Sequence, residues 1–165
     1  MTIKIKNEKL LKIITPEKKI CIMGIGNFDR ADDYSGIAII ENLEKIDFSE
    51  NIKIINSGPV PEAFTGVIKD FEPDVLVIVD AAMMDEKPGK IRVFSEKDVD
   101  DAYMVTPHKV SMTMYMKYLR HYLKDIKGVF IGVQPFSLSY MEEMSPQVKE
   151  SVEFISEYLT KLLQK

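Results

Sequence analysis

The segment Val75-Leu76-Val77-Ile78-Val79, followed directly by Asp80, decides the fold of this chain. Five consecutive apolar residues predict a strand that is buried on both faces, as in a parallel sheet with helices on either side. The carboxylate that follows indicates more than packing, because a buried carboxylate costs free energy unless it is hydrogen-bonded, paired or metal-bound. A cap in the loop after the strand is the alternative interpretation of Asp80.

Strand and helix patterns alternate on both sides of this segment. The expected strands are 19–24, 52–55, 75–79, 90–94 and 129–133, and the expected helices are 35–46, 61–71, 111–123 and 145–162. Such alternation predicts one domain over residues 1–165, a hydrolase- or phosphorylase-like α/β/α sandwich of three layers with a mostly parallel five-stranded sheet. For the first 15 residues we expect a small helix on the sheet edge or a loosely packed segment.

Composition excludes several classes of protein. The chain has 165 residues, of which 45% are hydrophobic, and a net charge of −4. No basic face is present, so we expect no nucleic-acid partner. The apolar runs are far shorter than the roughly 20 residues that span a bilayer, so we expect no membrane insertion. The single cysteine, Cys21, fits a core position in a cytoplasmic protein that has no signal peptide.

Three groups that can bind a metal follow expected strands or precede an expected helix. They are the acidic pair Asp32-Asp33 within the loop 24–36, then Asp80, and His108. Two carboxylates and an imidazole suit a divalent metal of hard to borderline character. Each has a plainer alternative, because Asp32 and Asp33 could cap the helix at 35–46 and His108 could lie in a surface loop.

Topology alone brings these residues together. Ligands of open parallel sheets bind outside the carboxyl ends of the strands, where Asp33, Asp80, Asn56 and Gln134 all follow a strand. A dinucleotide site is excluded because the Gly-x-Gly start lacks the third glycine and its acidic loop would repel phosphate. The sequence also does not favour a serine or cysteine protease, because no Gly-x-Ser-x-Gly elbow is present and Cys21 falls inside an expected strand. The other histidine, His121, falls off the apolar face of its expected helix and is expected to be solvated.

The order of these motifs resembles the hydrogenase maturation endopeptidases of [NiFe]-hydrogenases, in the branch that serves hydrogen-evolving, formate-hydrogenlyase-type enzymes. The resemblance covers about residues 19–160. It is carried by Gly24-Ile25-Gly26-Asn27 with Asp32-Asp33, Val79-Asp80-Ala81, Pro88-Gly89, Thr106-Pro107-His108 and Ile131-Gly132-Val133-Gln134-Pro135. The family fold further implies that the strand at 90–94 is antiparallel to its neighbour.

The resemblance implies an aspartyl-peptidase-like endopeptidase that removes a C-terminal extension from the large-subunit precursor after nickel insertion. Asp33, Asp80 and His108 correspond to the metal contacts, with Asp33 and Asp80 as the catalytic candidates. The nickel is supplied by the substrate and serves as the recognition signal, so it is not a permanent cofactor. A nickel-dependent docking or chaperone module and a small-molecule metallohydrolase are the alternative functions.

The chain departs from the family pattern at two positions. Tyr34 stands where many relatives have glycine after the acidic pair, and its bulk could alter substrate access. Asn56 stands where many relatives have aspartate, and its amide lacks the charge that a catalytic role at that position would use.

Overall fold

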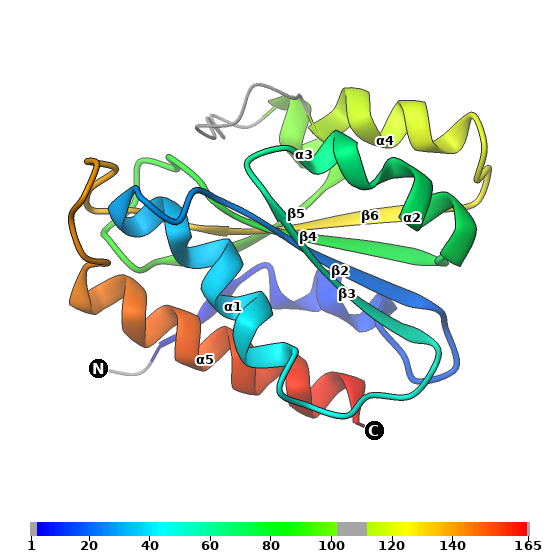
Figure 1. Ribbon diagram of the computed structural model, residues 1–165, viewed down its shortest axis with the longest axis horizontal. Coiled ribbons are helices and arrows are strands. Elements are labelled where there is room, and N and C mark those ends of the chain that lie inside the picture. Colours follow the sequence, from blue (N-terminus) through cyan, green and yellow to red (C-terminus); the bar gives the residue numbers. More distant parts are fainter. Residues whose placement is uncertain (1–2, 102–111, 165) are drawn as a thin grey trace.

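A six-stranded sheet forms the middle layer of the computed structural model, which describes residues 3–101 and 112–164. The strands are β1 (Ile5–Lys6), β2 (Ile20–Ile25), β3 (Ile52–Gly58), β4 (Val75–Ala81), β5 (Ile91–Ser95) and β6 (Lys127–Val133). Their order across the sheet is β1-β5-β6-β4-β2-β3 (Figure 1). Every neighbouring pair is parallel except β5 and β6, so the antiparallel strand that the family resemblance implied is confirmed.

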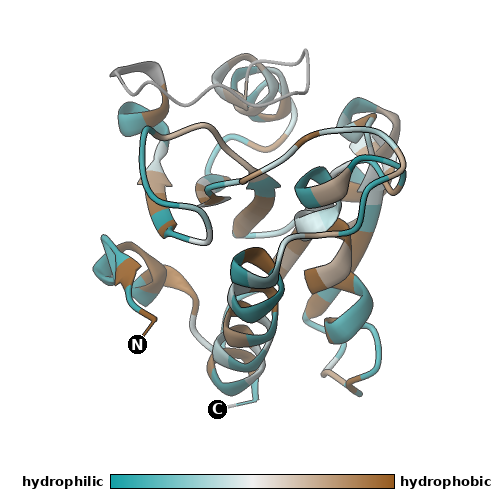
Figure 2. Ribbon diagram, turned by 90° about the vertical axis from the view of Figure 1, so that its left-hand side faces the viewer, coloured by the Kyte–Doolittle hydropathy of each residue, from teal (hydrophilic) through white to brown (hydrophobic). Residues whose placement is uncertain are grey.

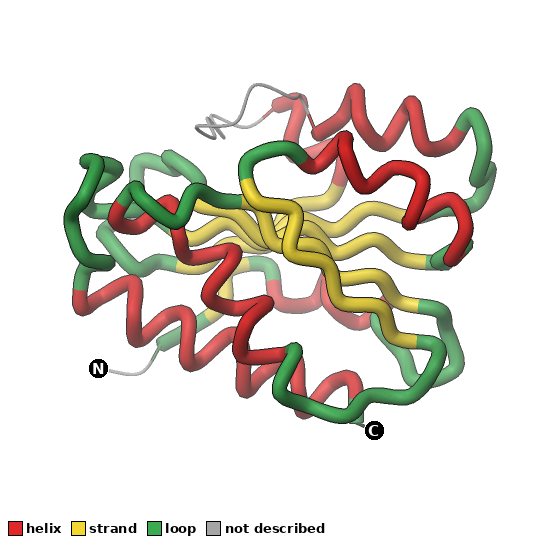
Figure 3. The backbone as a smooth tube through the Cα atoms, in the orientation of Figure 1, coloured by secondary structure: helices red, strands yellow, loops and turns green. Residues whose placement is uncertain are grey.

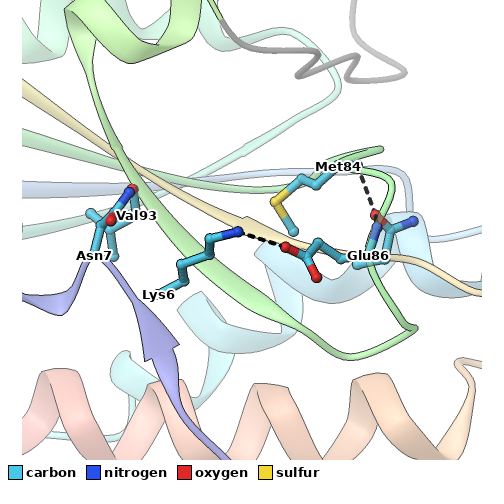
Figure 4. A network of polar contacts seen from close by, with 6 residues as sticks. Lys6, Asn7, Met84, Glu86 and Val93 are labelled. Atoms are coloured by element: carbon cyan, nitrogen blue, oxygen red, sulfur yellow. Dashed lines mark hydrogen bonds and ion pairs between the residues drawn. The ribbon is translucent and has the colours of Figure 1, made fainter.

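The sheet has six strands, so the expected count of five was wrong. The additional strand is β1, which contains two residues and pairs in parallel with β5. Side chains fix it in place: Lys6 Nζ lies 2.8 Å from Glu86 Oε1, and Asn7 Nδ2 donates to the Val93 carbonyl at 3.2 Å (Figure 4). The short helix η1 (Glu8–Ile13) follows it, so of the two expectations for the first 15 residues the small helix is confirmed.

Helices cover both faces of the sheet, as the tube in Figure 3 shows. One face packs against α1 (Ser35–Leu43) and α5 (Pro146–Leu163), and the other against α2 (Thr65–Phe71), α3 (Glu96–Asp101) and α4 (Met112–Arg120). Two one-turn helices, η2 (Ala31–Tyr34) and η3 (Pro61–Phe64), lead into α1 and α2. The three-layer sandwich is therefore confirmed, and α3 is an element that the sequence did not predict.

The two faces of the sheet bury different side chains. The α1–α5 face is aliphatic, with Val75, Val77 and Val79 of β4 packed against Ile40 and Leu159. The opposite face includes Leu76 and Ile78, together with methionine and aromatic side chains such as Met116 and Phe130. The strands are mostly hydrophobic in Figure 2, whereas the helices change from hydrophobic to hydrophilic around their circumference. This alternation along β4 is what a strand buried on both faces requires.

Candidate active site

The candidate site residues lie at the carboxyl edge of the parallel strands, on the left of Figure 1. Asp33 belongs to η2, which follows β2, and Asp80 is the penultimate residue of β4. Gln134 follows β6, and Asn56 lies near the end of β3. His108 lies outside the described residues. The sheet thus brings Asp33 and Asp80 to one edge, while their joint role as metal contacts stays a prediction.

Glycines allow α1 to sit directly on this edge. A Cβ atom at Gly36 would lie 2.2 Å from the Ile25 carbonyl oxygen and 2.5 Å from the Val79 carbonyl oxygen. A Cβ atom at Gly26 would lie 2.2 Å from the Asp33 carbonyl oxygen. Such distances leave no space for a side chain, so these glycines serve close packing of the backbone. The result places the turn that holds Asp33 against the ends of β2 and β4.

Asp32 is a structural anchor, and it does not cap α1 as the alternative interpretation of the acidic pair supposed. Its buried carboxylate accepts hydrogen bonds from the amides of Phe136 and Ser137 at 2.7 and 3.0 Å. It also accepts from the amide and hydroxyl of Ser145 at 2.6 and 3.0 Å. Four donors around one carboxylate compensate its burial. Sequence reasoning missed this role because the donors lie more than 100 residues along the chain.

Further contacts join the loop 26–34 to the loop 134–145. The Asp32 amide donates to the Ser137 carbonyl at 3.1 Å, and the Met141 amide donates to the Asp29 carbonyl at 2.8 Å. Arg30 Nε donates to the Leu138 carbonyl at 3.1 Å, and its guanidinium lies 4.9 Å from the ring centroid of Tyr140. The two loops are therefore joined by several contacts, and they pack together next to the turn that holds Asp33.

Asp33 and Asp80 are almost completely buried, with 1% and 4% of their surface exposed. Asp80 shares the alternation of Leu76 and Ile78, which places it on the face that α2 and α4 cover. In the chain, α4 follows the segment that contains His108. Among residues 3–101 and 112–164, no three His, Cys, Asp or Glu side chains form a group that could hold a metal. The proposed set of three contacts therefore needs His108.

Gln134 organises the segment that follows Asp80. Its side-chain oxygen accepts hydrogen bonds from the amides of Met84 at 2.7 Å and Glu86 at 3.3 Å. Its side-chain nitrogen donates to the Pro135 carbonyl at 3.2 Å. The sequence placed Gln134 at this edge, and the structure assigns it the task of fixing the backbone after β4.

The two departures from the family pattern have clear local roles. The Tyr34 hydroxyl donates to Glu41, and its ring meets Phe28 edge-on at 5.2 Å between centroids. Burial, and then the hydrogen bond to Glu41, raises the pKa of Tyr34 to about 12, so the phenol stays neutral. The exposed Asn56 accepts from the Gly58 amide at 3.1 Å and thereby closes a turn.

The remaining predictions on single residues are confirmed. His121 is exposed just beyond α4, with its ring edge-on to Tyr122 at 5.1 Å between centroids. Cys21 is a fully buried free thiol in β2, where burial raises its pKa to about 12. A thiol so buried and so weakly acidic is a packing residue and not a nucleophile.

Comparisons with known proteins decide the family. A family model described as hydrogenase maturation protease matches residues 37–162. A protein of Methanocaldococcus jannaschii that is named as a hydrogenase maturation protease is 31% identical over 151 residues, which cover 87% of this chain and 88% of that protein. The chain belongs to the hydrogenase maturation protease family.

Other members of the hydrogenase maturation protease family agree in sequence and structure. The hydrogenase 3 maturation protease of Escherichia coli is 27% identical over 84% of this chain and 86% of its own length. The crystal structure of the maturation protease HycI from Thermococcus kodakarensis superposes with a TM-score of 0.84 at 29% identity, covering 94% of this chain and 99% of that one. The chain is thus a peptidase of this family, built on the same fold.

No helix within the described part of this maturation protease is long and apolar enough to cross a membrane. The longest, α5, has 18 residues and carries charged side chains along its exposed face.

Proposed function

We propose that this maturation protease cleaves the C-terminal extension from a [NiFe]-hydrogenase large-subunit precursor, in the cytoplasm, once nickel has been inserted. The observation that carries the proposal is the placement of two buried carboxylates, Asp33 and Asp80, at one edge of the sheet. Carboxylates at such a position can approach a divalent ion that arrives with the substrate. His108, in the segment before α4, completes the proposed set of contacts.

In the proposed reaction, the nickel of the docked precursor is the recognition signal. Contacts from Asp33, Asp80 and His108 to this substrate metal hold the nearby scissile peptide in place, which provides proximity. A water oxygen attacks the peptide carbonyl carbon, the C–N bond breaks, and the departing amine takes up the proton. Either a carboxylate acts as the base that activates this water, or the substrate metal polarises it.

The direct test is an incubation with nickel-loaded and nickel-free precursor, read as a mobility shift on a gel. We expect cleavage of the nickel-loaded form only. Asp33→Asn, Asp80→Asn and His108→Ala should each abolish cleavage, whereas the matched control His121→Ala should cleave like wild type. Cleavage of both precursor forms would refute nickel recognition, and full activity of Asp80→Asn would refute its role.

The same preparation separates the two alternative functions. A metallohydrolase would contain a stoichiometric metal that survives chelation, and a docking module would bind the precursor without cleaving it. For the free protease we expect weak nickel binding that fades below a pH of about 6.5, because an ordinary imidazole must lose its proton to bind a metal. Calorimetric titration with nickel at pH 5.5 and 7.5 measures this dependence.

A further inference from the structure

A surface groove begins at the turn that holds Asp33 and runs between α1 and α5. Its volume is about 530 Å³. Ala31 and Tyr34, which line it, belong to the same turn as Asp33. The groove therefore adjoins the turn that holds Asp33 on the aliphatic side of the sheet, whereas Asp80 lies on the opposite face.

The base of the groove is apolar and made of small side chains. Ala31 and Val152 are 2% and 5% exposed, and Ala38 on α1 lies beside them. At the rim stands Phe28, which is 71% exposed and is held edge-on against Tyr34. A large exposed aromatic ring beside an apolar groove is typical of a protein-binding surface, because binding would remove both from water.

The charges along the groove are mainly negative. Glu142, Glu143 and Glu153 line it together with a single lysine, Lys149. The lysine is already engaged, since its Nζ lies 3.2 Å from Glu143 Oε2. The groove thus offers exposed carboxylates above an apolar base, and it repels anionic segments.

We propose that this groove binds a cationic, amphipathic segment of the large-subunit precursor. The inference rests on the proposed function, because the occupant is a segment of the precursor that the protease cleaves. Lysine or arginine side chains suit it on two counts: their charged ends meet the carboxylates, and their aliphatic stems cover the apolar base. A second copy of this chain fits less well, because its net charge is −4.

The test compares two triple variants that change the net charge equally. The groove variant is Glu142→Gln, Glu143→Gln and Glu153→Gln, and the control is Glu44→Gln, Glu50→Gln and Glu157→Gln, three exposed residues outside the groove. For cleavage of nickel-loaded precursor we expect the groove variant to raise KM about tenfold and to change kcat less than about twofold. The control should stay within about twofold of wild type in both constants, and added salt should weaken wild type more than the groove variant.

Several outcomes would contradict the proposal that the groove binds the precursor. An unchanged KM in the groove variant would contradict binding of the precursor in the groove, while the proposed protease function would still stand. An equal rise of KM in both variants would also contradict it, because the effect would then come from net charge and not from the groove. If wild type cleaves no precursor, the proposed function fails separately. Interferometry then measures the affinity of each variant for uncleaved precursor, and a weaker affinity of the groove variant alone would support binding in the groove. A wild-type dimer in sedimentation that dissociates only in the groove variant would show a second copy as the occupant.

Discussion

The two edges of the sheet are ends of the same strands, yet their loops differ in kind. At the carboxyl edge the loops 26–34 and 134–145 are long and are joined through Asp32. At the amino edge residues 72–74 suffice to connect α2 with β4, and Asp74 there accepts a hydrogen bond from the Lys19 amide at 2.8 Å. At the carboxyl edge Asp32 thus joins two loops into one surface, whereas at the amino edge Asp74 accepts a single hydrogen bond from a backbone amide.

Exposed apolar side chains and positive φ angles are both present at the carboxyl edge. Phe136 and Met141, both in the loop 134–145, are 72% and 86% exposed. Ala31, Asp85 and Met141 hold positive φ angles of 36°, 55° and 60°, a region that costs free energy for residues other than glycine. The exposed apolar side chains of the loop 134–145 suit a binding surface, whereas positive φ angles occur at both edges, because Glu72 at the amino edge has a φ of 52°.

The largest difference between the edges should appear in activity. Asp33→Asn and Asp80→Asn at the carboxyl edge should each lower the rate of precursor cleavage at least about 10²-fold, the effect of losing a catalytic acid or base. The exposed Asp74→Asn at the amino edge should leave the rate unchanged. Single-turnover cleavage assays measure this, with thermal melts to confirm folding. A loss of rate in Asp74→Asn would remove the distinction between the edges.

Asp32 and Asp74 provide the second comparison, in stability. Asp32→Ala should lower the free energy of unfolding by about 3 kcal/mol or more, because it removes the acceptor of four hydrogen bonds, two of them from the buried Ser145. Asp74→Ala removes one exposed hydrogen bond and should cost about 0.5–1 kcal/mol. Urea unfolding followed by circular dichroism measures both values. Equal losses would mean that Asp32 does not anchor the two loops.

A third comparison uses two amide side chains that each bond twice to the backbone of a nearby segment. Gln134 accepts from the Met84 and Glu86 amides, and Asn51 donates to the Pro16 and Lys18 carbonyls at 2.7 and 2.8 Å. Replacing either by alanine should lower the free energy of unfolding by about 1–2 kcal/mol. Only Gln134→Ala should also slow cleavage, because it loosens the backbone after Asp80. A slow Asn51→Ala variant would contradict this assignment.

The smallest effect concerns two exposed residues with positive φ. Glu72, at 52°, ends α2 at the amino edge, and Met141 lies in the loop 134–145. Glycine at either position should raise the free energy of unfolding by up to about 1 kcal/mol, since glycine adopts this conformation without steric cost. We expect Met141→Gly alone to raise KM for the precursor. If Glu72→Gly raises it equally, the exposed apolar side chains of the carboxyl edge are not a binding surface.

The parts of the fold that could be predicted are those in which the hydrophobic pattern lies within a single strand or helix. The apolar run of β4 and the amphipathic pattern of α5 give the layers, and Asp80 then lies at the carboxyl edge by topology. The two residues of β1 are too few to show any periodicity, so the sixth strand escaped prediction. Its position depends on β5 and on the pairing of Lys6 with Glu86, which no local pattern reveals.

The site could be predicted in part for the same reason. Asp33 and Asp80 stand beside their own strands, so the sequence indicated where both would lie. The structural role of Asp32, in contrast to the proposed catalytic role of Asp33, could not be predicted, because the groups that donate hydrogen bonds to Asp32 belong to the loop 134–145. The acidic groove also joins residues from opposite ends of the chain, Phe28 and Glu153 among them.

The position of β6 has a consequence for how the protein is made. Among the strands that the structure describes it is synthesised last, yet it lies between β5 and β4, and the donors to Asp32 follow it in the chain. A nascent chain that ends before residue 127 would hold two separate strand groups with open edges, and such edges attract other chains. The contacts between Asp32 and the loop 134–145 can therefore form only after residue 145 has been synthesised.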